Sequence, residues 1–303
     1  IPVAPPDFKS GFIGLIGRPN VGKSTLMNEL VGEKVAITSP VAQTTRNRLR
    51  GILTTETAQM IFVDTPGIHK PHHELGKIIV KNAQSTIEAV DLNLLIFDVS
   101  TPAGGGDRYI VDLLKKTNVP VLVGLNKSDL VSEEKREKNC ATYREILGDQ
   151  SWELVEFSAL TGMGLDSLQE TLRDRLEIGP YYYPPDLVSD QPERFVMAEL
   201  IREQILRETR QEIPHSVAIV IDQITEEKNL TAIRATINVE RSSQKGILIG
   251  KKGTMLKRIG TAARAEMQKI IAGKVYLELF VRVQAKWRDS ARQVAEFGYF
   301  QES

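Results

Sequence analysis

The feature that most constrains the fold is the segment Gly17–Ser24, which reads GRPNVGKS. It follows the apolar run Phe12–Ile16 and precedes a helical pattern over Ser24–Leu30. A G-x-x-x-x-G-K-S segment between a strand and a helix predicts a P-loop, whose backbone N–H groups and helix N-terminus face phosphates. Lys23 then supplies positive charge, and Ser24 offers a hydroxyl to Mg²⁺. The expected contacts to a bound nucleotide are Gly17, Asn20, Val21, Gly22, Lys23, Ser24 and Thr25.

The rest of the first half alternates between strand and helix patterns. A helical pattern covers Asp107–Lys116, and apolar runs predict strands over Met60–Val63, Leu92–Val99, Val119–Leu125 and Leu154–Phe157. Such alternation indicates an α/β fold with a mostly parallel sheet and helices on both faces. We expect this domain to cover residues 11–178, after an N-terminal extension of residues 1–10.

A second motif, Asp64-Thr65-Pro66-Gly67, follows the predicted strand Met60–Val63. A carboxylate at a strand end near a P-loop is placed to hold Mg²⁺ through water, which is the role we expect for Asp64. The backbone N–H of Gly67 is expected to meet the γ-phosphate. Since Lys23, Asp64 and Gly67 act on the reacting phosphate, we expect them to be catalytic.

Two further motifs predict the choice of base. Asn126-Lys127-Ser128-Asp129 ends a predicted strand, and a carboxylate there accepts two hydrogen bonds from guanine that adenine cannot donate. Asn126, Lys127 and Asp129 are therefore expected to bind GTP or GDP. Ser158, Ala159 and Leu160 follow the next strand, where their backbone N–H groups are expected to meet the guanine O6.

These motifs resemble those of translation-factor-like GTPases. The resemblance implies a threonine ligand to Mg²⁺ within Gln43-Thr44-Thr45-Arg46. We choose Thr45, with Thr44 as the alternative, and we expect Thr45 to be catalytic together with Lys23, Asp64 and Gly67. Ile68 stands where many GTPases carry a water-orienting glutamine, so slow intrinsic hydrolysis is implied. Asn20 resembles a residue that helps to bind K⁺ in some of these enzymes, and a purely loop-forming role is the alternative.

Neither the histidines nor the cysteine predict a metal site. His69, His72 and His73 follow Gly67, and a solvated loop is the favoured interpretation over a metal site, because no cysteine accompanies them. Cys140 is the only cysteine, which excludes an intrachain disulfide and indicates a reducing compartment. No stretch is long and apolar enough to predict a membrane span.

The second half of the chain has a different element order, after a predicted linker over residues 179–192 that is rich in Tyr and Pro. A helix over Arg194–Arg210 precedes strands over Val217–Ile221 and Thr231–Val239; two helices and the strand Val275–Val283 follow, and a helix over Trp287–Phe297 closes the chain. The motif Ile249-Gly250-Lys251-Lys252-Gly253 lies between the two helices. A G-x-x-G loop in this order predicts an α+β type II KH domain over residues 193–303, and the five motif residues are expected to bind RNA.

Charge supports a polyanionic partner for this half. The whole chain has a net charge of zero, but residues 241–292 contain 13 Lys or Arg against 3 Asp or Glu. A neutral chain with one basic end can still bind a polyanion locally. A GTP hydrolase whose C-terminal domain docks on a protein or membrane surface is the alternative.

The combination resembles the Era GTPases over about Phe12–Tyr299. The resemblance implies a GTP-hydrolysing switch that binds the single-stranded 3′ end of small-subunit ribosomal RNA and assists assembly of the small ribosomal subunit. It also implies a monomeric cytoplasmic protein with peripheral association at the inner membrane face. An organellar matrix or stroma is the alternative location.

Overall fold

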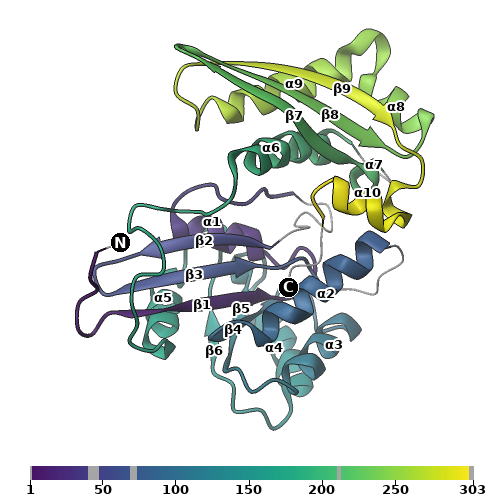
Figure 1. The fold of residues 1–303 in the computed structure, drawn as a ribbon. Helices are drawn as coiled ribbons and strands as arrows, with labels where there is room; N and C mark the ends of the chain where they lie inside the picture. Colours follow the sequence, from purple (N-terminus) through teal and green to yellow (C-terminus); the bar gives the residue numbers. More distant parts are fainter. Residues whose placement is uncertain (1, 40–47, 69–73, 210–212, 300–303) are drawn as a thin grey trace. The chain divides into compact units, whose positions relative to one another are not determined.

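The computed structural model describes residues 2–39, 48–68, 74–209 and 213–299 (Figure 1). The chain forms two compact units. The first contains most of the residues up to Asp190, and the second contains Gln191–Ser303 together with two short segments, Ile37–Thr44 and His72–Ile78.

The first unit is built on a six-stranded sheet with the order β2-β3-β1-β4-β5-β6. All neighbours pair in parallel except β2, which is antiparallel to β3. The mostly parallel sheet is therefore confirmed; β2 has no counterpart among the predicted strands, since Arg50 and Gly51 interrupt its apolar pattern. The strands are β1 (Lys9–Ile16), β2 (Leu49–Thr54), β3 (Ala58–Asp64), β4 (Leu92–Asp98), β5 (Val121–Asn126) and β6 (Leu154–Glu156).

Helices cover both faces of this sheet. Alternate residues of β4 and β5, such as Phe97 and Val123, pack into a core with side chains of α2, α3 and α4. Met27 of α1 packs on Gly51 of β2, and α5 contacts β1. The helices are α1 (Lys23–Val31), α2 (Glu74–Glu88), α3 (Gly105–Leu114), α4 (Glu133–Leu147) and α5 (Leu165–Arg175), with a short 3₁₀ turn η1 (Ser128–Leu130).

Both ends of the first unit are tied to its sheet. β1 begins at Lys9, within the stretch expected to be an extension, and Phe8 is buried. Residues 179–190, most of the predicted linker, group with the first unit. The side chain of Gln59 on β3 accepts hydrogen bonds from the backbone N–H groups of Tyr182 (2.8 Å) and Tyr183 (3.0 Å) in this segment.

The second unit has the predicted order of helix, two strands, two helices and a strand, with the short helix α7 (Ile213–Ser216) added before the first strand. β7 (Ala218–Glu227) is antiparallel to β8 (Leu230–Val239), which pairs in parallel with β9 (Lys274–Val283). Figure 1 shows this sheet with α9 along it. The helices are α6 (Glu193–Glu208), α7 (Ile213–Ser216), α8 (Ser242–Ile249), α9 (Thr254–Met267) and α10 (Ala291–Glu296), with 3₁₀ turns η2 (Lys251–Gly253) and η3 (Trp287–Asp289).

One face of the three-stranded sheet forms the core of the second unit. Every second residue of β8 from Ile233 to Val239 packs against α6 and α9, as the alternating pattern predicts. On β9, Leu277, Leu279 and Val281 share this inner face. The indole N–H of Trp287 donates to the backbone oxygen of Ser216 at 2.9 Å, which fixes the segment after β9.

Among the described residues, no helix combines the length and apolar character that crossing a membrane requires.

Candidate functional site

The P-loop connects the end of β1 to the start of α1, as the sequence predicts. Gly22 has φ +102°, and a Cβ atom there would lie 2.3 Å from Nδ2 of Asn126, so only glycine fits. Lys23 is buried, and its ammonium donates to the backbone oxygens of Gly17 at 3.2 Å and Arg18 at 3.0 Å. The loop backbone thus holds this cation at the N-terminus of a helix, where anions are favoured.

The electrostatics of Lys23 suit an anionic ligand. Burial lowers the pKa of its ammonium from 10.5 to about 8, and the nearby charge of Asp64 acts in the opposite direction. Negative charge from a phosphate would favour the charged form and raise this pKa. Phosphate binding and protonation of Lys23 are therefore coupled.

A hydroxyl and a carboxylate meet beside the P-loop. Ser24 donates to Oδ2 of Asp64 at 2.6 Å, and Asp64 is buried at the end of β3. Such hard oxygen ligands fit Mg²⁺. Gly67 lies against the P-loop, because a Cβ atom there would be 2.5 Å from the backbone nitrogen of Pro19.

Several predicted residues lie outside the described part of the chain. These include the expected Mg²⁺ ligand Thr45, its alternative Thr44, and His69, His72 and His73. Within the described part, no group of three or more His, Cys, Asp or Glu side chains is arranged to hold a metal ion.

Asn126 joins three of the sequence motifs through one buried amide. Its Nδ2 donates to the backbone oxygen of Val21 in the P-loop at 2.8 Å. Its Oδ1 accepts from the backbone N–H groups of Lys127 at 2.8 Å and Ala159 at 2.9 Å. The P-loop, β5 and the segment after β6 are therefore held together by this side chain.

Lys127 makes a second bridge to the P-loop. It has φ +67°, and its ammonium donates to the backbone oxygen of Asn20 at 2.7 Å and to Oδ2 of Asp98 at 2.6 Å. The sequence patterns do not predict Asp98, although an acid at the end of the parallel strand β4 is a usable signal. Asn20 itself has φ +64°, a conformation suited to a loop-forming asparagine.

The expected base-binding residues line the same end of the sheet. Ser158 and Ala159 are buried after β6, while Leu160 is 74% exposed. Asp129 is exposed in the turn η1, whose first residue, Ser128, donates to the backbone oxygen of Phe157 at 3.1 Å. The Asp129 carboxylate is thus accessible, in a turn that is hydrogen-bonded to the end of β6.

Ile68 points away from solvent. It is 2% exposed and belongs to the core shared with α2, α3 and α4. This residue therefore performs a packing role in the first unit and offers no polar group to a water molecule.

The predicted G-x-x-G loop joins α8 to α9 in the second unit. Gly250 has φ +71°, and a Cβ atom there would approach Met255 Cβ at 2.7 Å, so the close turn requires glycine. Lys251 and Lys252 are exposed, and Ile249 is half-buried at the end of α8. The loop thus presents two cations next to the N-terminus of a long helix.

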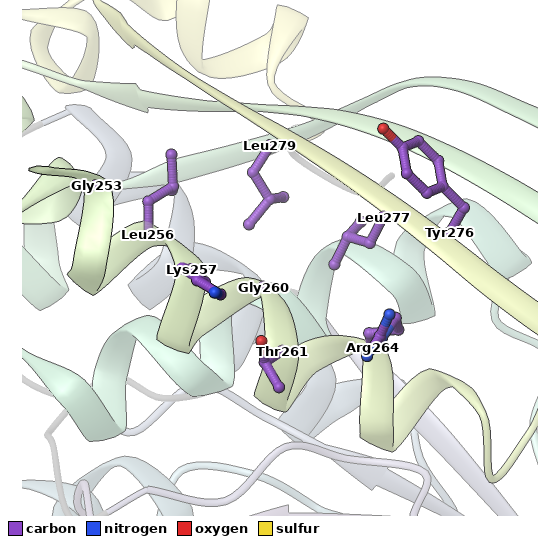
Figure 2. A pocket seen from close by; sticks show the side chains of 9 residues that line it. All are labelled: Gly253, Leu256, Lys257, Gly260, Thr261, Arg264, Tyr276, Leu277 and Leu279. Atoms are coloured by element: carbon purple, nitrogen blue, oxygen red, sulfur yellow. The ribbon is translucent and has the colours of Figure 1, made fainter.

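A groove of about 410 Å³ runs from this loop between α9 and β9 (Figure 2). Its lining combines the apolar side chains of three leucines with the cations Lys257 and Arg264. Gly260 faces Leu279 across the groove, where a Cβ atom would lie 3.4 Å from Cδ1 of Leu279. The lining residues are Gly253, Leu256, Lys257, Gly260, Thr261, Arg264, Tyr276, Leu277 and Leu279.

Comparisons with known proteins agree with this geometry. A family model described as a 50S ribosome-binding GTPase matches residues 12–127, and a KH domain model matches residues 212–288. GTPase Era of Crocosphaera subtropica is 65% identical over 299 residues, which are 99% of this chain and 95% of that protein. The chain belongs to the Era GTPase family. Era of Rippkaea orientalis is 66% identical over the same shares of the two chains.

Solved structures of the Era family share the whole fold. A single-residue variant of Aquifex aeolicus Era bound to GDP·AlF₄⁻ has a TM-score of 0.92 and 38% identity, covering 96% of this chain and 99% of that chain. The same values hold for Era in complex with MgGDPNP and nucleotides 1506–1542 of 16S ribosomal RNA. The expected α/β GTPase fold followed by a KH domain is therefore confirmed.

Proposed function

We propose that this protein is a GTP-hydrolysing switch that binds the single-stranded 3′ end of small-subunit ribosomal RNA and assists small-subunit assembly. The observation that supports the proposal is the presence, in one chain, of P-loop and strand-end motifs joined by the buried Asn126 amide and of a G-x-x-G loop beside a groove lined by leucines and two cations. The Era complex with MgGDPNP and 16S ribosomal RNA supports it, because that protein shares the entire fold. The GTPase family model that matches residues 12–127 is described as 50S ribosome-binding, but this match does not include the KH domain.

In the proposed nucleotide site, Gly17–Thr25 surround the phosphates and Ser24, Asp64 and Thr45 hold Mg²⁺, which neutralises charge on the phosphates when bound. Asp129 reads the guanine edge, with Asn126 and Lys127 holding the loop that presents it. Ser158, Ala159 and Leu160 complete the base site through their backbone.

Hydrolysis in this proposal depends on electrostatic stabilisation. Lys23 stabilises the developing charge between the β- and γ-phosphates, and the Gly67 N–H contacts the γ-phosphate. Because buried Ile68 cannot orient water, turnover without a partner is slow. We also propose that K⁺ bound beside Asn20 supports turnover better than Na⁺.

In the proposed RNA site, residues 193–303 form the functional KH domain, and Ile249–Gly253 approach the phosphates of the strand. The two glycines allow close backbone approach, Lys251 and Lys252 supply charge, and the groove between α9 and β9 takes the bases. Single strands fit this arrangement, because their bases are available to an apolar floor.

GTP gates RNA binding in this account. Residues 37–39 and 74–78, which flank the predicted switch segments, group with the second unit rather than the first. Within that unit, the backbone N–H of Thr38 donates to Oε1 of the buried Glu203 on α6 at 3.2 Å. A change in the switches would therefore act on the helix that packs against α9.

The proposed setting follows from the partner. A factor that acts on the small subunit works where the subunit is assembled, and we place this protein in the cytoplasm as a monomer. Its expected peripheral membrane association stays a prediction.

Crosslinking in cells, followed by sequencing of the bound RNA, tests the proposal. We expect reads concentrated at the 3′ end of small-subunit ribosomal RNA. Reads spread evenly over cellular RNA, or crosslinks to protein alone, would overturn it in favour of a hydrolase whose C-terminal domain docks on another surface.

A further inference from the structure

The outer face of the second unit's sheet carries aromatic rings that the core does not use. β9 alternates, so Leu277 and Leu279 point toward α9 while Tyr276 lies on the opposite side of the strand (Figure 2). Tyr276 is 55% exposed, and Phe280, four residues further on the same face, is 47% exposed. Exposed rings of this size on a sheet are typical of platforms for nucleic-acid bases.

The charges on this face are compatible with a polyanion. Glu278 lies between the two rings in the strand register, and Arg234 of β8 donates to it at 2.9 Å, so its charge is compensated. Asp222 on β7 accepts a hydrogen bond from the neutral Thr236 hydroxyl at 2.7 Å, which orients this carboxylate without cancelling its charge. Arg282 follows Phe280 on the same face and is exposed. The face thus offers two rings and a cation, and the acid that lies between the two rings is paired with Arg234.

This face is continuous with the groove. Tyr276 lines the groove and also begins the outer row, and β9 is an edge strand that pairs only with β8 among the described residues. A strand leaving the groove at Tyr276 reaches Phe280 after about 13 Å, at ~3.3 Å per residue of β-strand. One RNA strand can therefore occupy both surfaces.

We infer that the RNA strand held in the groove continues over the edge of β9 onto the outer face of the sheet, where a base stacks on Phe280. The inference rests on the proposed RNA-binding function and extends it. The groove holds the core nucleotides, and the outer face binds their neighbours, so that the protein covers a longer single-stranded segment than the groove alone.

The test compares a four-nucleotide RNA, the length that a KH loop clamps, with RNAs extended by four nucleotides on the 5′ or the 3′ side. Four nucleotides stacked at about 3.4 Å span the distance to Phe280. Affinities are measured for the parent, Phe280→Ala, Phe280→Leu and Tyr109→Ala, all loaded with a non-hydrolysable GTP analogue. Tyr109 on α3 is also 47% exposed and serves as the matched control.

We expect one extension to tighten binding to the parent, and Phe280→Ala to lose roughly 5- to 100-fold on that RNA, the effect of one lost base stack. Phe280→Leu should lose nearly as much, because it keeps apolar area without a π-face. The short RNA should bind all four proteins equally, which also shows that the variants fold.

Equal affinities of parent and Phe280→Ala for both extended RNAs would overturn the inference and leave the proposed groove intact. Full affinity of Phe280→Leu for the extended RNA would also overturn it, since an apolar protein contact tolerates leucine. Failure of the parent to bind any of the three RNAs would instead remove the proposed function itself.

Discussion

The two sites of this protein are built in opposite ways. The proposed nucleotide site combines segments from residue 17 to residue 160, and hydrogen bonds of the buried Asn126 side chain hold three of them together. The proposed RNA site lies within one stretch of sequence, from Ile249 to Leu279, and its cations are exposed. The two sites should therefore respond differently to substitution. A change in the interlocked nucleotide site should disturb several contacts, whereas a change in the open RNA site should act locally and alter an affinity that depends on salt.

The largest effect is expected from Asp129→Asn in the nucleotide site. It removes two charge-assisted hydrogen bonds to guanine, each worth roughly 1.5–3 kcal/mol, so GTP affinity should fall by about 1,000-fold. Xanthosine triphosphate should bind the variant more tightly than it binds the parent, because the new amide can pair with the extra carbonyl of xanthine. Nucleotide titrations measure the affinities for GTP and xanthosine triphosphate, with Asp149→Asn at an exposed position as the control. Unchanged GTP affinity in Asp129→Asn would refute the role of Asp129.

In the open site, Lys251→Asp combined with Lys252→Asp should lower RNA affinity by on the order of 100-fold or more, at 1–3 kcal/mol for each lost contact. GTP affinity should barely move. The parent should also bind RNA more weakly as salt increases, with a steeper slope than the variant, because phosphate contacts release counterions. The control is Lys228→Asp at the exposed turn between β7 and β8. An equal loss with that control would mean that net charge, not the loop, determines binding.

Asn126→Ala tests the interlocking directly. It leaves buried partners of the amide unsatisfied, so we expect a loss of about 1–3 kcal/mol in unfolding free energy together with a roughly tenfold weaker GTP affinity. Asn139→Ala is the matched control, since its buried amide donates to the backbone oxygen of Val99 at 2.8 Å, outside the predicted motifs. Chemical denaturation measures the loss of stability, and nucleotide titration measures the loss of GTP affinity. Both variants should lose stability, but only Asn126→Ala should lose GTP affinity.

A smaller effect concerns pH. Burial lowers the pKa of Lys23 to about 8, so its ammonium is charged below that pH with or without nucleotide. Above pH 8 the free protein loses this proton, and nucleotide binding must restore it. GTP affinity should therefore be level below pH 8 and fall by up to about tenfold per pH unit above it. Lys23→Arg keeps its charge over this range, so its GTP affinity should not fall above pH 8. The same fall in both proteins would mean that a group other than Lys23 titrates.

Much of this architecture can be predicted from the sequence because its signals are local. Apolar runs predict β3 and β4, and the motifs that follow strands predict which residues approach the nucleotide. The strand and helix order around Gly250–Gly253 likewise predicts the KH fold. These patterns work because parallel strands end at one edge of a sheet and because glycines mark close backbone approaches.

The hydrogen bonds that join distant segments of the first unit could not be predicted in the same way. The bond between Asn126 and Val21 spans 105 positions, and those between Gln59 and Tyr182 or Tyr183 span more than 120. Local patterns carry no information about such distant partners. The contact of Asp98 with Lys127 and the burial of Ile68 could not be predicted for the same reason, since only the packed sheet reveals what these residues contact.

The most direct test of the central claim, that one site controls the other, is a titration of a short 3′-end ribosomal RNA oligonucleotide into the protein in two nucleotide states. With a non-hydrolysable GTP analogue bound, RNA affinity should exceed that of the GDP state by roughly 5-fold or more, the usual range for coupled sites. By reciprocity, RNA should tighten binding of the GTP analogue relative to GDP by the same factor. Identical RNA affinities in the two states would leave two independent binding domains and contradict the switch.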